Sequence, residues 1–379
     1  MTQDDTDATG VRLVLEDGSE FRGQSFGAVA CVTGEVVFNT GMTGYVEALT
    51  DPSYRGQMLV LTYPLVGNYG VPAPRPPQSI EAPYESGRIE PQGLVVQSYS
   101  SHYSHQAARR SLGSWLHQEG VPGVTGIDTR TLTRNLREHG TMRGWLFPES
   151  LGLEQARRTA RAIEMSREVF LDVAPSRPVT YEGGPTRVLL VDCGAKDQIA
   201  RSLLQRGATV VRVPWHADLA QYAREAHGIL IGNGPGDPQD LHSLSEQVRG
   251  LMDSFRGPIF GVCLGHQILA LAAGATTYKL RYGHRGVNQP VQDLLTRHCY
   301  VTSQNHGYAV ADDSLGADWQ PWFVNINDGT NEGLRSRSRP HFSVQFHPEA
   351  APGPQDTSYL FDEFLSLAAT LPAWRKAGG

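Results

Sequence analysis

The chain has 379 residues, of which 40% are apolar and 19% are charged, and its 33 Lys and Arg against 39 Asp and Glu give a formal charge of −6. This is the composition of a soluble globular protein, and at roughly 150 residues per domain the length predicts two or three domains, of which two is our working number. The weak negative charge would not attract phosphates or anionic lipid, which argues against roles at nucleic acids or membrane surfaces.

The N-terminal sequence MTQDDTDATG is acidic and polar, whereas a signal peptide begins with basic and then apolar residues. The most apolar stretch, residues 259–275, is too short for the ~20 apolar residues of a membrane span. We therefore expect a cytoplasmic protein without a membrane segment. The cysteines are far apart in the sequence and fit reduced thiols better than a disulfide or metal framework: Cys31, Cys193, Cys263 and Cys299. No metal site is predicted.

The first half begins as a β-rich segment. Alternating apolar residues from Val11 to Leu15, followed by Asp17-Gly18, predict a β-hairpin. Apolar runs separated by Gly and Pro predict further strands at residues 35–38, 58–61 and 93–96.

Irregular and helical segments follow in this half. The proline-rich residues 71–77 predict an irregular loop. Helical spacing of Leu112, Trp115 and Leu116 predicts one helix, and Asp128 is placed to cap another that ends before Gly140. A further helical stretch is expected through about Phe170.

The second half has the sequence pattern of an α/β domain. Residues 172–186 combine three prolines and two glycines without periodicity, which predicts a linker between a β-rich α/β domain at 1–171 and a second domain at 187–379. In the second domain, short apolar runs alternate with helical ones, the pattern of a mostly parallel sheet covered by helices on both faces. The predicted strands are 188–191, 209–213, 228–231 and 258–262, and the predicted helices are 198–205, 241–255 and 264–273. Ligands of such sheets bind at the carboxyl ends of the strands.

A cysteine stands at one of these strand ends. Cys263, within Gly261-Val262-Cys263-Leu264-Gly265, follows a predicted strand and precedes a predicted helix. The G-x-C-x-G pattern at such a turn is typical of a nucleophile elbow. The partial positive charge and free N–H groups of the helix start favour a thiolate there. A lone cysteine is more often a buried structural residue, but this context favours a nucleophile.

A base for that nucleophile is available in His347-Pro348-Glu349, near the end of another apolar run. Proline favours extended backbone at His347, so that the two side chains point to a similar side and Glu349 can orient the imidazole. The loop 232–238 (GNGPGDP) follows a third strand. Its glycine spacing and prolines do not fit a dinucleotide-binding loop. Its backbone N–H groups could instead form an oxyanion hole, although a mere tight turn is an equal interpretation.

These motifs together resemble a known family. The C-terminal half resembles the class I, triad-type glutamine amidotransferases. Nearly the whole chain, through LVLEDG, FNTGMTGYVEALTDPSY, IDTRTLTRNLRE and AAPGP, resembles the small subunits of carbamoyl-phosphate synthetase. The segment 70–93 and Cys193, where an aromatic residue is common, depart from the family pattern.

The resemblance implies roles for residues at matching positions. Cys263 would attack the glutamine side-chain amide to give a γ-glutamyl thioester, with His347 as general base and then acid and Glu349 orienting it. The oxyanion hole would use the N–H groups of Gly234 and Leu264. The remaining contacts to glutamine would come from Ser53, Gly236, Gln267, Asn305, Gly307 and Tyr308.

The resemblance also implies a partner. Because nothing in the sequence resembles a phosphate cradle, ATP and Mg²⁺ are expected on a large partner subunit, and no cofactor is expected on this chain. That subunit would form a heterodimer or larger hetero-oligomer with this chain and make carbamoyl phosphate from bicarbonate and ammonia for arginine and pyrimidine synthesis. The alternatives are a glutaminase subunit of another amidotransferase, a non-catalytic scaffold subunit and a free-standing cysteine hydrolase.

Overall fold

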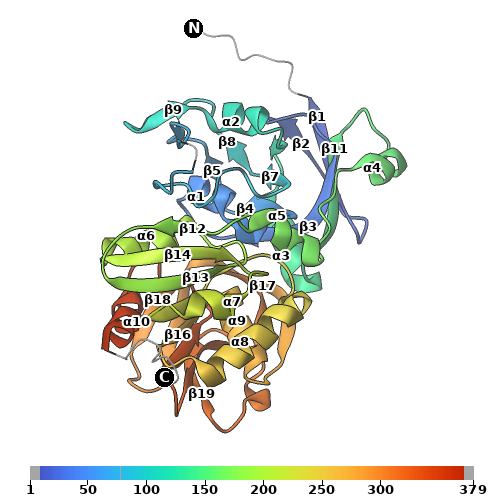
Figure 1. Cartoon of the computed structure of the whole chain (residues 1–379). Coiled ribbons are helices and arrows are strands. Elements are labelled where there is room, and N and C mark those ends of the chain that lie inside the picture. The colour runs from blue at the N-terminus through green and yellow to red at the C-terminus, as the bar shows by residue number, and fades with distance from the viewer. Residues whose placement is uncertain (1–8, 77, 371–379) are drawn as a thin grey trace. The chain divides into compact units, whose positions relative to one another are not determined.

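The computed structural model describes residues 9–76 and 78–370, and the chain divides into two compact units with the boundary between Glu164 and Met165 (Figure 1). The boundary is earlier than predicted, and residues 172–186 are not a free linker. Helix α5 (Arg167–Val173) ends inside that segment, and strand β12 (Val179–Tyr181) pairs with β14 of the second unit. Proline and glycine are tolerated beside short edge strands, so composition could not separate an edge strand from a linker. No helix among the described residues has the length and hydrophobicity needed to cross a bilayer.

The first unit contains a closed β-barrel, in agreement with the β-rich prediction. Around the barrel the strands are β1 (Gly10–Leu15), β11 (Met142–Pro148), β3 (Val32–Asn39), β4 (Gln57–Leu61), β7 (Gly93–Val95), β10 (Gly123–Thr125) and β2 (Glu20–Ser25). The predicted hairpin is confirmed, since β1 and β2 pair antiparallel with Leu13 opposite Phe21. Closure leaves no edge strand in the barrel, which protects it from edge-to-edge association.

Short elements complete the first unit. They are α1 (Tyr45–Thr50), η1 (Pro52–Tyr54), β5 (Leu65–Val66), β6 (Val71–Pro72), β8 (Ser98–Tyr99), β9 (Ala108–Arg110), α2 (Leu112–Gln118), α3 (Thr129–His139) and α4 (Leu153–Thr159). The capping prediction for α3 is confirmed: Asp128 accepts a hydrogen bond from the Thr131 N–H at 2.9 Å, and Gly140 follows the last helical residue. The loop predicted at 71–77 carries the short strand β6, and residue 77 lies outside the described residues.

The second unit is built on a ten-stranded sheet. Its strands, in spatial order, are β12 (Val179–Tyr181), β14 (Ala208–Pro214), β13 (Thr186–Asp192), β15 (Gly228–Ile231), β16 (Ile259–Val262), β21 (His341–Val344), β20 (Asn331–Ser336), β19 (Trp319–Asn325), β17 (Thr277–Asp293) and β18 (Cys299–Val310). The five central strands from β14 to β21 are parallel, as predicted. The antiparallel extension from β20 to β18 was not predicted.

Helices and short 3-10 segments complete the second unit. They are α5, α6 (Asp197–Gln205), α7 (Leu219–Ala223), η2 (Pro238–Leu241), α8 (His242–Ser254), α9 (Leu264–Ala272), η3 (Asp312–Ser314) and α10 (Tyr359–Thr370). Phe260 of β16 is fully buried against Phe361 and Phe364 of α10, and α8 packs against α9 (Figure 1). This packing fixes the carboxyl ends of β13, β15, β16 and β21 beside one another.

Candidate active site

Cys263 occupies a strained turn between β16 and α9. Its backbone has φ +54° and ψ −105°, a conformation that residues other than glycine rarely adopt. Its side chain is 2% exposed. The flanking glycines are required by close packing: a Cβ on Gly261 would overlap the carbonyl of Gly265, and a Cβ on Gly265 would overlap the carbonyl of Ile231. These are the features of a nucleophile elbow, as the G-x-C-x-G pattern predicts.

The loop after β15 lies against the start of α9. A Cβ on Gly234 would overlap the carbonyl of Cys193 and lie 2.9 Å from the Leu264 side chain. Leu264 is the first residue of α9, where backbone N–H groups have no acceptor within the helix. Gly234 thus lies close to Leu264, and the oxyanion hole formed by their N–H groups stays a prediction.

The four cysteines differ in burial and in the backbone that carries them. Cys193 is fully buried beside this loop, and burial raises the pKa of its thiol well above the ordinary value, which makes it unreactive. Cys31 is half-buried, and Cys299 is exposed. Only Cys263 stands at a strained strand-to-helix turn.

His347 and Glu349 form the predicted pair. The Nδ1 atom of His347 lies 2.6 Å from Oε1 of Glu349, and the two residues are 2% and 4% exposed. Burial favours the neutral imidazole, but the charges of Glu349 and Cys263 outweigh it and raise the pKa of His347 to about 10. Because Glu349 occupies Nδ1, the nitrogen left for proton transfer is Nε2.

Lys196 is a residue that the sequence analysis missed. Its ammonium group lies 3.2 Å from Glu349 Oε1 and donates a hydrogen bond of 2.6 Å to the Ala350 carbonyl. Burial favours a neutral carboxyl at Glu349, yet the charges of Lys196 and His347 lower its pKa to about 2. Lys196 follows the carboxyl end of β13, so the rule that sites form at strand ends could have identified it.

A buried ion cluster holds the segment that carries Lys196. The Arg212 guanidinium forms ion pairs with Asp192 and Asp197, and it donates a hydrogen bond of 2.8 Å to the Ala195 carbonyl. Asp192 also accepts hydrogen bonds of 2.7 Å from the N–H groups of Gly194 and Ala195. This cluster therefore holds the backbone on both sides of Lys196.

The predicted glutamine contacts from α9 and β18 lie together. The Cys263 thiol is 3.6 Å from the Asn305 carbonyl, and the Gln267 amide donates 3.0 Å hydrogen bonds to the Tyr308 carbonyl and to Gln345 Oε1. Gly307 is between Asn305 and Tyr308 on the same strand. Asn305 therefore lies at the nucleophile, and Gln267 connects α9 to Tyr308 of the same strand, whereas the binding of glutamine by these residues stays a prediction.

For Gly236 and Ser53, two further predicted glutamine contacts, the structure gives the local surroundings only. Gly236 has φ +79° and approaches Phe170 of α5 so closely that a Cβ would lie 2.9 Å from the ring. Ser53 belongs to the first unit, where it is buried in η1 and its N–H donates 2.9 Å to Asp51 Oδ1. The roles of both residues in binding glutamine stay predictions.

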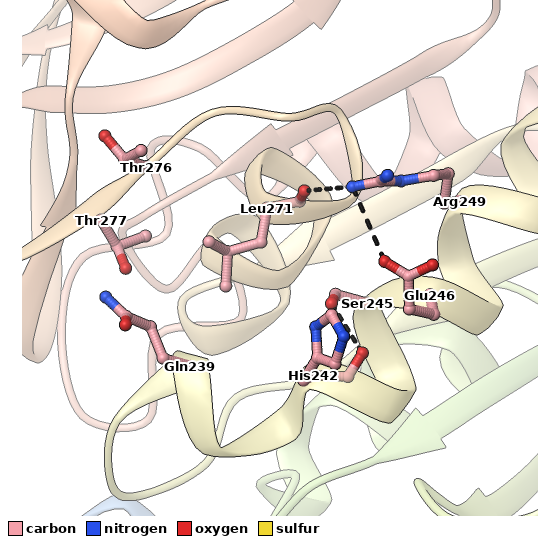
Figure 2. Close-up of a pocket in the computed structure, with 8 residues that line it drawn as sticks. All are labelled: Gln239, His242, Ser245, Glu246, Arg249, Leu271, Thr276 and Thr277. Carbon is pink, nitrogen blue, oxygen red and sulfur yellow. Dashed lines mark hydrogen bonds and ion pairs between the residues drawn. The ribbon is translucent and has the colours of Figure 1, made fainter.

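A separate hollow of about 330 Å³ lies among η2, α8, the end of α9 and the start of β17 (Figure 2). None of the triad residues lines it. Arg249 points toward its rim, where the guanidinium donates to the carbonyls of Leu271 and Ala272 and lies 3.8 Å from Glu246. These bonds explain Arg249 as a cap on the carboxyl end of α9.

The fold of the second unit and the Cys-His-Glu arrangement define a class I glutamine amidotransferase domain, and residues 189–367 match the family Glutamine amidotransferase class-I. Residues 13–146 match the family Carbamoyl-phosphate synthase small chain, CPSase domain. The chain therefore belongs to the carbamoyl-phosphate synthase small chain family, as the sequence resemblance indicated.

Individual relatives agree with this assignment. The chain is 46% identical over 358 residues to the carbamoyl phosphate synthase arginine-specific small chain of Aspergillus clavatus, covering 93% of this chain and 78% of that one. The corresponding protein of Aspergillus oryzae is 45% identical over 370 residues, covering 96% and 82%. A multifunctional protein of Saccharomyces cerevisiae is 43% identical over 392 residues, and the alignment covers 95% of this chain but only 18% of the yeast protein.

Proposed function

We propose that the chain is the glutamine-hydrolysing, ammonia-donating subunit of a carbamoyl-phosphate synthetase, with Cys263, His347 and Glu349 as its catalytic triad. Family membership and the amidotransferase domain support the activity. The single observation that supports the residue assignment most strongly is the 2.6 Å bond between His347 and Glu349 in a site whose cysteine stands on a strained elbow.

The proposed reaction uses these residues in two stages. His347, whose raised pKa keeps it protonated at neutral pH, holds the proton taken from the Cys263 thiol. Cys263 Sγ attacks the side-chain carbonyl carbon of glutamine as the thiolate, and the N–H groups of Gly234 and Leu264 bind the developing oxyanion. His347 then returns the proton to the leaving nitrogen, the carbon–nitrogen bond breaks, and ammonia and a γ-glutamyl thioester result. Water attacks the thioester by the same proton relay and releases glutamate. Glu349 stabilises the imidazolium in both stages.

Glutamine is held by residues around the nucleophile. In the proposal, its amino-acid end is held by Gln267, Asn305, Gly307 and Tyr308. The contacts of Asn305 with Cys263 and of Gln267 with Tyr308 support this role. Gly236 and Ser53 add further contacts. The amide of Gln267 is already oriented by two hydrogen bonds, which reduces the entropy lost on binding.

The ammonia is passed to a large partner subunit in a heteromer. That subunit carries the ATP and Mg²⁺ sites and makes carbamoyl phosphate from bicarbonate for arginine and pyrimidine synthesis, in the cytoplasm. The names of the relatives support this division: two are small chains, and the yeast relative is a far longer multifunctional protein. A scaffold role is disfavoured because the triad is complete, and a free-standing hydrolase would need no partner for full turnover.

The test separates the two nitrogen donors. Cys263→Ser is nearly isosteric, so the complex with the large subunit should assemble, make carbamoyl phosphate from added ammonium and fail with glutamine. The matched control is Cys299→Ser, an exposed cysteine outside the site, which should use both donors normally. Loss of ammonium-dependent synthesis in an assembled Cys263→Ser complex would contradict the donor-subunit assignment.

A further inference from the structure

Three buried side chains form a compact cluster in the antiparallel part of the second sheet. Among the residues that the structure describes, His284 of β17, His306 of β18 and Glu332 of β20 each offer one ligand atom, and these atoms lie within 4.8 Å of one another. All three residues are buried, with exposed fractions of 8%, 5% and 0%. None of them has a role in the proposed hydrolysis.

The distances suit a metal ion. His284 Nδ1 lies 3.4 Å from Glu332 Oε1, and His306 Nε2 lies 3.9 Å from the same oxygen. Two ligands bound to tetrahedral Zn²⁺ at about 2.0–2.1 Å are themselves separated by roughly 3.3 Å. Small shifts would bring these atoms to that spacing. The side-chain oxygen of Gln304, 3.2 Å from His306 Nε2, is placed to become a fourth ligand.

In each of the two histidines, the ring nitrogen that points away from the cluster has a hydrogen-bond acceptor, as is usual for histidines that bind metals. His284 Nε2 lies 2.8 Å from the Asp328 carboxylate, and His306 Nδ1 lies 2.8 Å from the Tyr308 carbonyl. An acceptor on the second ring nitrogen fixes the tautomer and leaves the first nitrogen with a lone pair that faces the cluster. Both histidines of this cluster have such an acceptor.

The carboxylate of Glu332 has one oxygen whose hydrogen-bonding capacity is not satisfied. Its Oε2 atom is buried and has no hydrogen-bond partner, while Asn325 donates 3.0 Å to its Oε1. An unsatisfied buried carboxylate oxygen costs free energy unless something cationic binds it. A divalent ion would provide that partner, and its charge would balance Glu332 together with Asp328. Asp328 is 41% exposed at its side chain and offers an ion a route from solvent.

We propose that His284, His306 and Glu332 bind a divalent transition-metal ion, Zn²⁺ in the first instance, as a structural site. Two nitrogen ligands with one or two oxygens suit Zn²⁺. The ion would join β17, β18 and β20 behind the segment that carries Asn305, Gly307 and Tyr308. The site is distinct from the triad and takes no part in the proton relay.

The experiment measures metal binding by the full-length chain without a polyhistidine tag. After chelator treatment and dialysis against Zn²⁺, elemental analysis should find about one ion per chain in the Cys263→Ser variant, in which the triad thiol cannot bind it. Glu332→Gln should weaken binding at least about 10-fold, since even partners of metal ligands cost 10- to 100-fold when changed. His298→Ala, an exposed histidine of the same unit, is the matched control and should bind normally.

Two measurements keep the proposal testable if Glu332→Gln fails to fold. Co²⁺ bound to the Cys263→Ser chain should give visible ligand-field bands without thiolate charge-transfer bands. Asp328→Asn, a change at a half-exposed residue, should weaken Zn²⁺ binding about 10-fold or more. Sub-stoichiometric Zn²⁺ in the Cys263→Ser chain, thiolate bands with Co²⁺, or unchanged affinity in Glu332→Gln or Asp328→Asn would each overturn the proposal in favour of a metal-free hydrogen-bonded network.

Discussion

Glu349→Gln isolates the orienting carboxylate of the triad. The 2.6 Å hydrogen bond from His347 is charge-assisted and buried, and bonds of this kind contribute about 1.5–3 kcal/mol. If that stabilisation applies to the imidazolium formed in the transition state, its loss lowers the rate of glutamine hydrolysis by on the order of 10- to 100-fold. His347→Ala removes the proton relay itself and should cost more, about 100- to 10,000-fold.

The same substitution has a second, measurable effect through Lys196. This lysine is 3% exposed, and glutamine at position 349 would remove the carboxylate that lies 3.2 Å from its ammonium group. Removing one partner of a buried ion pair costs about 3–5 kcal/mol of folding free energy. The double variant Lys196→Met with Glu349→Gln removes both charges and should be more stable than Glu349→Gln alone by about 1 kcal/mol or more. It should not regain activity.

The assays are glutamate release by the full-length chain and chemical denaturation followed by circular dichroism. Glu349→Gln should show a lower kcat with a smaller change in KM, because the carboxylate orients the base and does not bind glutamine. The reasoning is refuted if Glu349→Gln and His347→Ala have equal defects, or if the double variant is no more stable than the single one.

Four further predictions follow from the described residues. Ser53→Ala should raise the KM for glutamine more than it lowers kcat, and unchanged glutamine kinetics would remove Ser53 from the site. A glutamine-like electrophile should label Cys263 first, as peptide mass mapping can show, whereas a small general alkylating reagent should also modify the exposed Cys299. Gly265→Ala should unfold the elbow or abolish hydrolysis, because its Cβ would overlap a backbone carbonyl of β15; near-normal activity and stability would contradict the packing. Because the pKa of Glu349 is lowered from 4.5 to about 2 on folding, its ionisation contributes about 3 kcal/mol of stability above pH 4.5 that is lost as the pH falls toward 2. The free energy of unfolding, measured by chemical denaturation, should therefore fall more steeply from pH 6 to pH 3 for the wild type than for Glu349→Gln.

Much of the site could be predicted from short stretches of sequence. The elbow at Cys263 is encoded within five residues, because strand, tight turn and helix start each depend on neighbours in the chain. His347 and Glu349 are two residues apart, and their bond follows from local geometry across one proline. The hairpin of β1 and β2 and the cap at Asp128 are likewise local.

Contacts between distant segments could not be predicted in this way. Lys196 reaches the Ala350 carbonyl, 154 residues further along the chain, only because β13, β15, β16 and β21 lie side by side in the sheet. The candidate metal ligands come from three strands that become neighbours through the antiparallel extension. The sequence by itself therefore determined the family and the choice of the proposed nucleophile and base, since each depends on closely spaced residues. The order of the strands, set by burial of the whole core, decided which lysine holds Glu349 and which histidines meet Glu332.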